Sequence, residues 1–371
     1  HGFVIINSAK PASVFLTGEL RAMPPTLDLA VQRQRDILLR LARDWVRRSP
    51  RSATANESLA HALELRGDVG ATGNAESALT ALRVARAEST DPDQQLRLAM
   101  SEVRLFVKRG EFDAARVLAD SVLAHADQNP PRPSAFAGLA ALTGRAALTG
   151  RLLAQASSAS GGNNDLLGPH LPEQVRSLAA MLVAYAALGV CDSVPSQVAR
   201  VEGAIDTYVE PNGRITAWNQ LLPRALSMAA PCDGGRALLR VSSDDRLIQM
   251  QRALARGDHS AIRHHFALLD ETRRSDRPGD VAIDYTFQEA WILSAIGDST
   301  SAAMRLDRAL NALPTLGDSI VERVDQAAAL GRALRLRQAM ANRSPAAEMA
   351  RNHLAALWRE ADDDVRGRQP R

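Results

Sequence analysis

Apolar residues recur every three or four positions along most of the chain, and short polar stretches rich in Gly or Pro separate these segments. Around Gly110 the spacing holds on both sides of the glycine, at Leu96, Ala99, Val103 and Phe106 before it and at Phe112, Ala115, Leu118 and Val122 after it. Residues spaced in this way lie on one face of a helix. The pattern predicts two amphipathic helices joined by a glycine turn, a helical hairpin that needs neighbouring hairpins to bury its apolar faces.

The same unit recurs along the chain, with turn glycines at Gly73, Gly110, Gly189, Gly257 and Gly297. After Gly297 a small residue (Ala302), a bulky residue (Leu306) and finally Pro314 follow in order. In this order of residues the chain resembles the tetratricopeptide repeat family. The resemblance implies an all-α fold, a right-handed superhelix of about seven antiparallel helical hairpins. The alternative is an irregular helical bundle.

The first 25 residues follow a different pattern. The runs GFVIINS and ASVFLTG are rich in β-branched and aromatic residues and are separated by AKP, which predicts a β-hairpin. The segment resembles a PEGA-type module, a kind mostly found outside the bacterial cytoplasm; the alternative is a lone hairpin docked on the first helices. We therefore expect a hairpin or anchor segment over residues 1–25, helical repeats over residues 26–361, and a polar C-terminal tail over residues 362–371.

The composition suits helices better than a sheet. Aromatic residues make up 4% of the chain and hydrophobic residues 46%, so the core rests on Ala, Leu and Val, which pack closely between helices. The net charge of +3 is spread along the chain, without the basic stripe that follows phosphates, so we expect no nucleic-acid binding. The apolar run over residues 177–191 is shorter than the roughly 18 residues that span a bilayer, and it predicts a buried helix.

No motif for catalysis or cofactor binding is found. The sequence has no nucleophile elbow, P-loop, dinucleotide-binding glycine fingerprint or HExxH zinc pair. His259, His264 and His265 are close in sequence, but their spacing does not bring two of them onto one helix face as metal ligands. The acidic residues 362–364 are interpreted as part of a solvated tail. We therefore expect no enzyme activity, no catalytic residue, no metal and no cofactor.

The two cysteines, Cys191 and Cys232, lie in the segments LGVCDSV and APCDGG, which we interpret as turns between antiparallel helices. Equivalent turns of neighbouring hairpins line one edge of a repeat array at a spacing of roughly 10 Å. A disulfide needs Cα atoms closer than about 7 Å, so a modest approach of the two turns allows a bridge. We favour the disulfide; two buried, reduced thiols are the alternative.

Candidate partner-binding residues come from two parts of the chain. Positions that face the concave side in the tetratricopeptide pattern map onto Arg104, Lys108, Gln251, Phe287 and Trp291. Arg and aromatic residues are common anchors of protein interfaces, although Phe287 and Trp291, four positions apart, would equally form a core stripe. The apolar start of the chain offers a docking strand with the residues Phe3, Val4 and Ile5.

These observations favour a non-catalytic protein–protein interaction or scaffold subunit, an accessory component of a larger bacterial membrane- or envelope-associated complex. Respiratory, photosynthetic and secretion complexes are examples of such assemblies. The alternative is an extracytoplasmic ligand- or peptide-sensing region of a signalling protein, because ARNHLAALWREADDD is similar to helical-repeat tails of some bacterial Ser/Thr kinases and transcription regulators. The chain opens at His1 without Met, which fits a removed signal peptide or membrane anchor; under the signalling alternative, an effector domain would precede it. We expect an extracytoplasmic location on the periplasmic face, with a cytoplasmic one left open.

Overall fold

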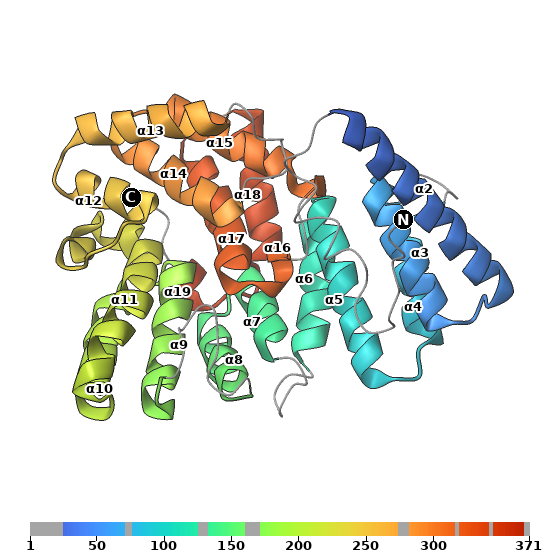
Figure 1. Ribbon diagram of the computed structural model, residues 1–371, viewed down its shortest axis with the longest axis horizontal. Coiled ribbons are helices and arrows are strands. Elements are labelled where there is room, and N and C mark those ends of the chain that lie inside the picture. The colour runs from blue at the N-terminus through green and yellow to red at the C-terminus, as the bar shows by residue number, and fades with distance from the viewer. Residues whose placement is uncertain are drawn as a thin grey trace. The chain divides into compact units, whose positions relative to one another are not determined.

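The computed structural model describes residues 25–70, 76–124, 133–159, 171–273, 282–315, 319–340 and 344–366 (Figure 1). Within these ranges every regular element is a helix, so the prediction of an all-α fold is confirmed. The predicted β-hairpin lies outside the described residues, apart from Pro25, the first residue of the first described helix.

The chain divides into two compact units at the bond between Arg109 and Gly110. The first unit contains the helices α2 (Pro25–Arg48), α3 (Ala53–Arg66), α4 (Ala78–Glu88) and α5 (Pro92–Lys108). The second unit begins with α6 (Phe112–Leu123), α7 (Pro133–Leu142), α8 (Ala146–Ala159), α9 (Glu173–Leu188), α10 (Val194–Tyr208), α11 (Pro211–Asp233) and the 3-10 helix η2 (Arg236–Arg240). It continues with α12 (Arg246–Ala255), α13 (His259–Arg273), α14 (Ile283–Ala295), α15 (Ser299–Asn311), η3 (Leu313–Thr315), α16 (Ser319–Glu322), α17 (Val324–Ala339), α18 (Pro345–Leu357) and α19 (Asp363–Arg366).

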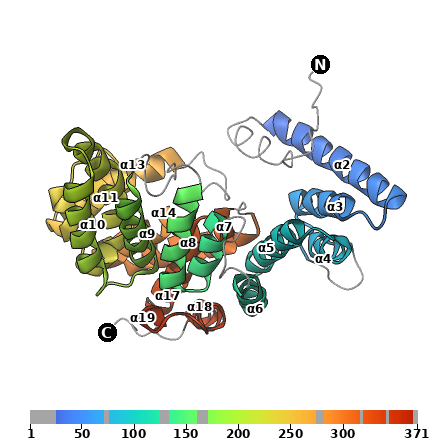
Figure 2. The ribbon, with the colours of Figure 1, turned by 90° about the horizontal axis from the view of Figure 1, so that it is seen from below.

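Helices of the first unit pack in the order of the sequence, each against the next (Figure 2). Three of them begin at a residue whose side chain accepts a hydrogen bond from the first turn: Ser52 before α3, Ser77 before α4 and Asp91 before α5. Such caps satisfy amide groups that have no partner inside the helix. The core between these helices is made of small and aliphatic side chains, as the composition predicts.

Turn glycines end several helices, as the hairpin pattern predicts. Gly110, Gly189, Gly257 and Gly297 all have a positive φ, between 70° and 87°. This left-handed conformation costs glycine nothing, and it reverses the chain immediately after a helix. In the second unit the turns at Gly189 and Gly297 separate the packed pairs α9/α10 and α14/α15. Gly73 lies outside the described residues.

The C-terminal helices of the second unit return to its first helices. Helix α17 packs against α7, α9 and α14, while α16 packs against α7 and α18 against α6 (Figure 1). Helices α16 and α7 are so close that a Cβ atom on Gly138 of α7 would lie 2.3 Å from the carbonyl oxygen of Val321 in α16. Repeats of a solenoid contact only their neighbours in sequence. These long-range contacts therefore resemble the bundle alternative more than an open array.

The predicted C-terminal tail begins with an ordered segment. Asp362 donates its amide N–H to the carbonyl of Gly144 at 3.1 Å, and its carboxylate accepts the amide N–H of Ala147 at 3.2 Å. Val365 is completely buried, which holds α19 against the unit. Within residues 362–366, Asp363, Asp364 and Arg366 are exposed to solvent, whereas Asp362 and Val365 dock the segment on the unit. Among the described helices, none has the length and apolar content that a bilayer crossing requires.

Candidate functional site

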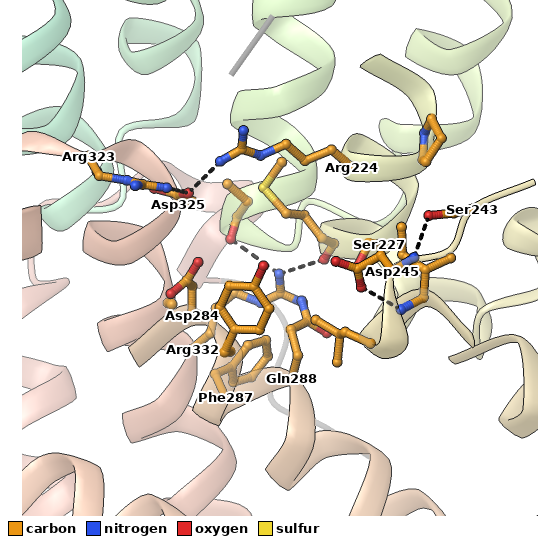
Figure 3. A pocket seen from close by; sticks show the side chains of 17 residues that line it. Arg224, Ser227, Ser243, Asp245, Asp284, Phe287, Gln288, Arg323, Asp325 and Arg332 are labelled. Carbon is orange, nitrogen blue, oxygen red and sulfur yellow. Dashed lines mark hydrogen bonds and ion pairs between the residues drawn. The ribbon is translucent and has the colours of Figure 1, made fainter. Parts of the chain in front are cut away.

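A pocket of about 500 Å³ lies in the second unit (Figure 3). Three helices each present one face to it, and their lining residues follow helical spacing: Arg224, Ser227 and Met228 from α11; Asp284, Phe287 and Gln288 from α14; Asp325, Ala329 and Arg332 from α17. Residues three or four positions apart share a helix face, which explains why these side chains converge. The lining is completed by Ala187 of α9 and by residues around the start of α12.

Helix α11 contains two prolines, Pro223 and Pro231, and Pro231 frees one of its backbone oxygens. A proline has no amide N–H, so Pro231 leaves the carbonyl of Ser227, four residues earlier, without its helical donor. The side-chain amide of Gln251 donates to this carbonyl at 3.1 Å, and it also donates to the side-chain oxygen of Gln288 at 3.1 Å. Gln251 is completely buried. It therefore repairs the proline break and ties α12 to α11 and α14.

Arg332 is the central cation of the pocket. Its Nη1 atom donates to three backbone carbonyls, those of Ala186 and Ala187 at the end of α9 and that of Met228 in α11, at 2.8 to 3.2 Å. Its guanidinium carbon lies 4.5 Å from the centroid of the Phe287 ring. The side chain is buried, and within the described part of the chain it forms no ion pair with a carboxylate. Burial lowers the pKa of this guanidinium to about 9, with a smaller contribution from Arg335.

A second cluster of charges centres on Asp325. Its carboxylate accepts hydrogen bonds from Arg224 at 3.0 Å and from Arg323 at 2.5 and 3.1 Å, as Figure 3 shows. Burial alone would raise the pKa of this carboxyl, but the two guanidinium groups outweigh burial and hold the pKa below its ordinary value. Asp325 is thus an anion that two cations neutralise.

The carboxyl of Asp284 differs from that of Asp325 in its hydrogen bonds and in the direction of its pKa shift. Its Oδ1 atom is buried and has no hydrogen-bond partner among the described residues. Burial raises the pKa of the Asp284 carboxyl, and the charge of Asp325 raises it further. Burial also raises the pKa of the neighbouring Tyr285, with Asp245 and Asp284 adding to the effect. Asp245 itself caps α12 by accepting the amide N–H of Ile248 at 3.1 Å. The pocket therefore holds one carboxyl with a buried oxygen that lacks a hydrogen-bond partner among the described residues.

The disulfide Cys191–Cys232 cross-links the two helix ends beside the pocket. Cys191 follows α9 and Cys232 lies in the last turn of α11, and their Cα atoms are 5.0 Å apart. Arg332 joins the same two helices through their backbone carbonyls. The wall formed by α9 and α11 is thus held by one covalent and one hydrogen-bonded connection.

The structure distributes the predicted partner-binding residues between the two units. Gln251 and Phe287 are buried at the pocket, where Phe287 is part of the lining; Trp291, one turn further along α14, is half-buried and does not line it. Arg104 and Lys108 are buried in the first unit, and both bind the carboxylate of Glu64, at 2.6 and 2.5 Å. These two cations face the interior of the chain. Phe3, Val4 and Ile5 lie outside the described residues.

Sequence reasoning missed the charged residues of the pocket. Asp325 and Arg332 stand seven positions apart in a helix whose remaining residues on that side are Ala and Leu. Charges are costly to bury, so an Asp and an Arg on the apolar face of a helix are a sequence signal for a buried polar site. In the described residues no three His, Cys, Asp or Glu side chains gather in a way that could hold a metal ion.

Comparison with protein-family models and with curated proteins finds no match to this chain.

Proposed function

We propose that this chain is a non-catalytic helical-repeat binding protein whose second unit recognises a small ligand or peptide in the pocket. The supporting observation is Arg332, a buried guanidinium that lines a pocket and has no carboxylate partner in the described part of the chain. A buried charge is costly unless it is paired, so a fold that only needed packing would place an apolar residue here. This proposal corresponds to the ligand- or peptide-sensing region of a signalling protein.

The proposed architecture is a right-handed array of tetratricopeptide-like hairpins. It is supported by the glycine turns and by the packing of consecutive helices, such as α3 on α4 and α8 on α9. In this proposal the return of α16, α17 and α18 closes the second unit into a compact ligand-binding body. A closed body positions a pocket more rigidly than an open array, in which each repeat contacts only its neighbours.

Thermal shift of the full chain against a library of small metabolites and short peptides tests the proposal. A ligand should raise the melting temperature of the wild type, because binding to the native state alone stabilises it. The Ser243→Trp variant places a large side chain on the pocket lining and should abolish the shift, whereas Ser242→Trp, one residue earlier and outside the lining, should keep it. The absence of any ligand whose shift depends on Ser243 would contradict the proposal.

A second candidate function, a scaffold subunit of a membrane- or envelope-associated complex, is favoured by helix α2. Ile37, Leu41 and Trp45 are spaced by four residues and are 47%, 53% and 41% exposed, so they form an apolar stripe on one face of the helix. Exposed arginines dominate the rest of the helix surface, including Arg33, Arg35, Arg40, Arg47 and Arg48. An amphipathic partner helix with acidic flanks fits both features.

Pull-down from solubilised membranes tests the scaffold candidate. A stoichiometric partner should be retained by the wild type and by Met304→Ser, which changes an exposed apolar residue of the second unit, and it should be lost with Leu41→Asp. Elution of the wild type without a stoichiometric partner would reject the candidate. A partner retained equally by all three proteins would also reject the α2 stripe as its docking surface.

We propose an extracytoplasmic location for the chain. Disulfides form and persist in oxidising compartments such as the bacterial periplasm and are rare in the cytosol, so the bridge between Cys191 and Cys232 supports this location. Alkylation of free thiols in intact cells before lysis tests it: both cysteines should be protected until a reductant is added. Complete alkylation without reductant would contradict the location.

A further inference from the structure

Two side chains of the pocket have polar atoms without a hydrogen-bond partner in the described part of the chain: Arg332 has free donors and Asp284 has a free acceptor. The Nη1 atom of Arg332 donates hydrogen bonds to three carbonyls, whereas its Nε and Nη2 atoms make no hydrogen bond within the described residues. Asp284 has a buried Oδ1 atom without a hydrogen-bond partner in the same part of the chain. A buried donor or acceptor without a partner destabilises the folded state. One ligand with an anionic end and a hydrogen-bond-donating end would satisfy both groups.

Gly189 lies beside the edge of the Arg332 guanidinium that carries Nε and Nη2. A Cβ atom on Gly189 would lie 3.3 Å from Nε and 3.7 Å from Nη2 of the guanidinium. Any larger residue at this position would crowd the two donors that have no partner. A carboxylate fits such an edge, because its two oxygens match the paired N–H groups of a guanidinium.

The charges around the pocket restrict the ligand further. Arg224 and Arg323 both pair with Asp325, whereas Arg332 is the lining arginine without a carboxylate partner among the described residues. Asp245, Asp284 and Asp325 would repel a phosphate with two negative charges. A singly charged carboxylate is therefore favoured, and the carboxyl of Asp284 offers an acceptor for an ammonium group on the same molecule.

Apolar side chains form part of the lining. Met228, Leu247, Ile248, Phe287 and Ala329 line the same pocket as the charged residues. Its volume of about 500 Å³ falls within the range of small-molecule sites. We propose that the pocket binds a zwitterion with an apolar side chain, a free amino acid or a short peptide, with its carboxylate on Arg332 and its ammonium on Asp284. This inference rests on the proposed function and names the ligand class.

Calorimetric titration of the full chain at pH 7 with leucine and with leucyl-leucine tests the inference, and the comparison of the two distinguishes an amino acid from a peptide. At least one should bind. Leucinamide and leucyl-leucinamide lack the carboxylate, and the N-acetylated forms lack the ammonium. Each of these derivatives should bind at least tenfold more weakly than its parent, since a hydrogen bond to a charged group contributes about 1.5 to 3 kcal/mol. Inorganic phosphate should not bind.

Two pairs of variants locate the ligand. Arg332→Met should weaken binding at least tenfold, whereas Arg335→Met should not, although Arg335 is on the same helix and its guanidinium also lies over an aromatic ring, 4.6 Å from that of Trp358. If Arg332→Met fails to fold, a pair of glycine variants provides the same test. Gly189→Ala and Gly257→Ala carry the same backbone strain, with φ of 70° and 73°, but only the methyl group at position 189 would approach Arg332. Gly189→Ala should lose binding and Gly257→Ala should keep it.

The outcomes separate this inference from the proposed function. Binding of leucine or leucyl-leucine that survives amidation, or that is unchanged in both Arg332→Met and Gly189→Ala, overturns the assignment of the carboxylate to Arg332. If neither compound binds while another chemical class gives a thermal shift that depends on Ser243, the zwitterion inference fails and the proposed function stands. If nothing binds in a manner that depends on Ser243, both fail.

Discussion

Arg332 and Phe287 meet in the interior of the second unit, with the guanidinium carbon 4.5 Å from the centroid of the ring. The cation comes from α17 and the ring from α14, and the carbonyls that share Nη1 come from α9 and α11. One side chain thus connects four helices. No carboxylate in the described part of the chain pairs with Arg332. Its positive charge is therefore stabilised by the electron-rich face of the ring and by the carbonyl dipoles.

Replacement of Phe287 by leucine should lower the free energy of unfolding by about 2 to 4 kcal/mol, because it removes both packing volume and a desolvated cation–π contact. Phe266→Leu is the matched control. Phe266 is also buried beneath a guanidinium, that of Arg305 at 5.1 Å, but Arg305 has a carboxylate partner, Glu289, at 3.2 Å. Denaturant titration should therefore show a larger loss for Phe287→Leu. Equal losses would contradict the special dependence of Arg332 on its ring.

Gln251 and Pro231 should be energetically coupled through the carbonyl of Ser227. Gln251→Leu removes the amide that serves this buried carbonyl and should cost about 1 to 3 kcal/mol. With Pro231→Ala, residue 231 regains an amide N–H that can donate to the same carbonyl, so Gln251→Leu should cost less in that background. A double-mutant cycle by denaturant titration measures the coupling. Strictly additive effects would show that Gln251 does not compensate for the proline.

The first unit should lose stability in acid through Glu64. Burial alone would raise the pKa of this carboxyl, but Arg104 and Lys108 outweigh burial, so the pKa in the folded state lies below the ordinary 4.5. A carboxyl with a lowered pKa contributes stability above its unfolded pKa and loses it as the pH falls through the folded one.

Glu64→Gln tests this contribution. At pH 7 the variant should be less stable by about 3 to 5 kcal/mol, since it leaves two buried cations without their anion. The difference from the wild type should shrink as the pH falls below 4.5. Glu57→Gln, on the same helix with a half-buried carboxylate 3.4 Å from Arg97, is the control and should cost about 1 kcal/mol or less. A pH-independent deficit for Glu64→Gln would contradict the ion-pair account.

Reduction of the disulfide should destabilise the second unit. The bridge closes a loop with a sequence separation of 41 residues, for which chain entropy gives about 4 kcal/mol. A reductant should lower the melting temperature of the wild type and leave a Cys191→Ser, Cys232→Ser double variant unchanged. The intact mass of the unreduced wild type should show no free thiol. Two free thiols, or an equal response of both proteins to the reductant, would contradict the bridge.

The helical fold could be predicted from the sequence because its signals are local. The three- and four-residue spacing around Gly110 and the positive φ of Gly189 and Gly297 depend only on nearby residues. The return of α17 to α7 depends instead on contacts between residues far apart in the chain, such as the Trp358 indole N–H that donates to the carbonyl of Leu142 at 3.0 Å. No periodicity indicates such a partner.

The candidate site could be predicted only in part. The family pattern predicts Phe287 and Gln251 on the concave surface, with a core stripe as the alternative for Phe287, and the structure places both side chains in the interior at the pocket. The same pattern predicts Arg104 and Lys108 on that surface, but both pair with the carboxylate of Glu64. Whether an arginine faces solvent or a buried carboxylate depends on tertiary packing. For the same reason, the sequence does not indicate the isolated charge of Arg332, because its surroundings are formed by the packing of α9, α11, α14 and α17.

A crystal structure of the chain grown with saturating leucyl-leucine shows whether Arg332 binds the carboxylate of a ligand. We expect density in the pocket with a carboxylate oxygen within about 3 Å of Nε or Nη2 of Arg332 and with the ammonium group next to Asp284. Density for the dipeptide elsewhere on the chain, or an empty pocket with Arg332 bound only to its three carbonyls, would contradict this expectation.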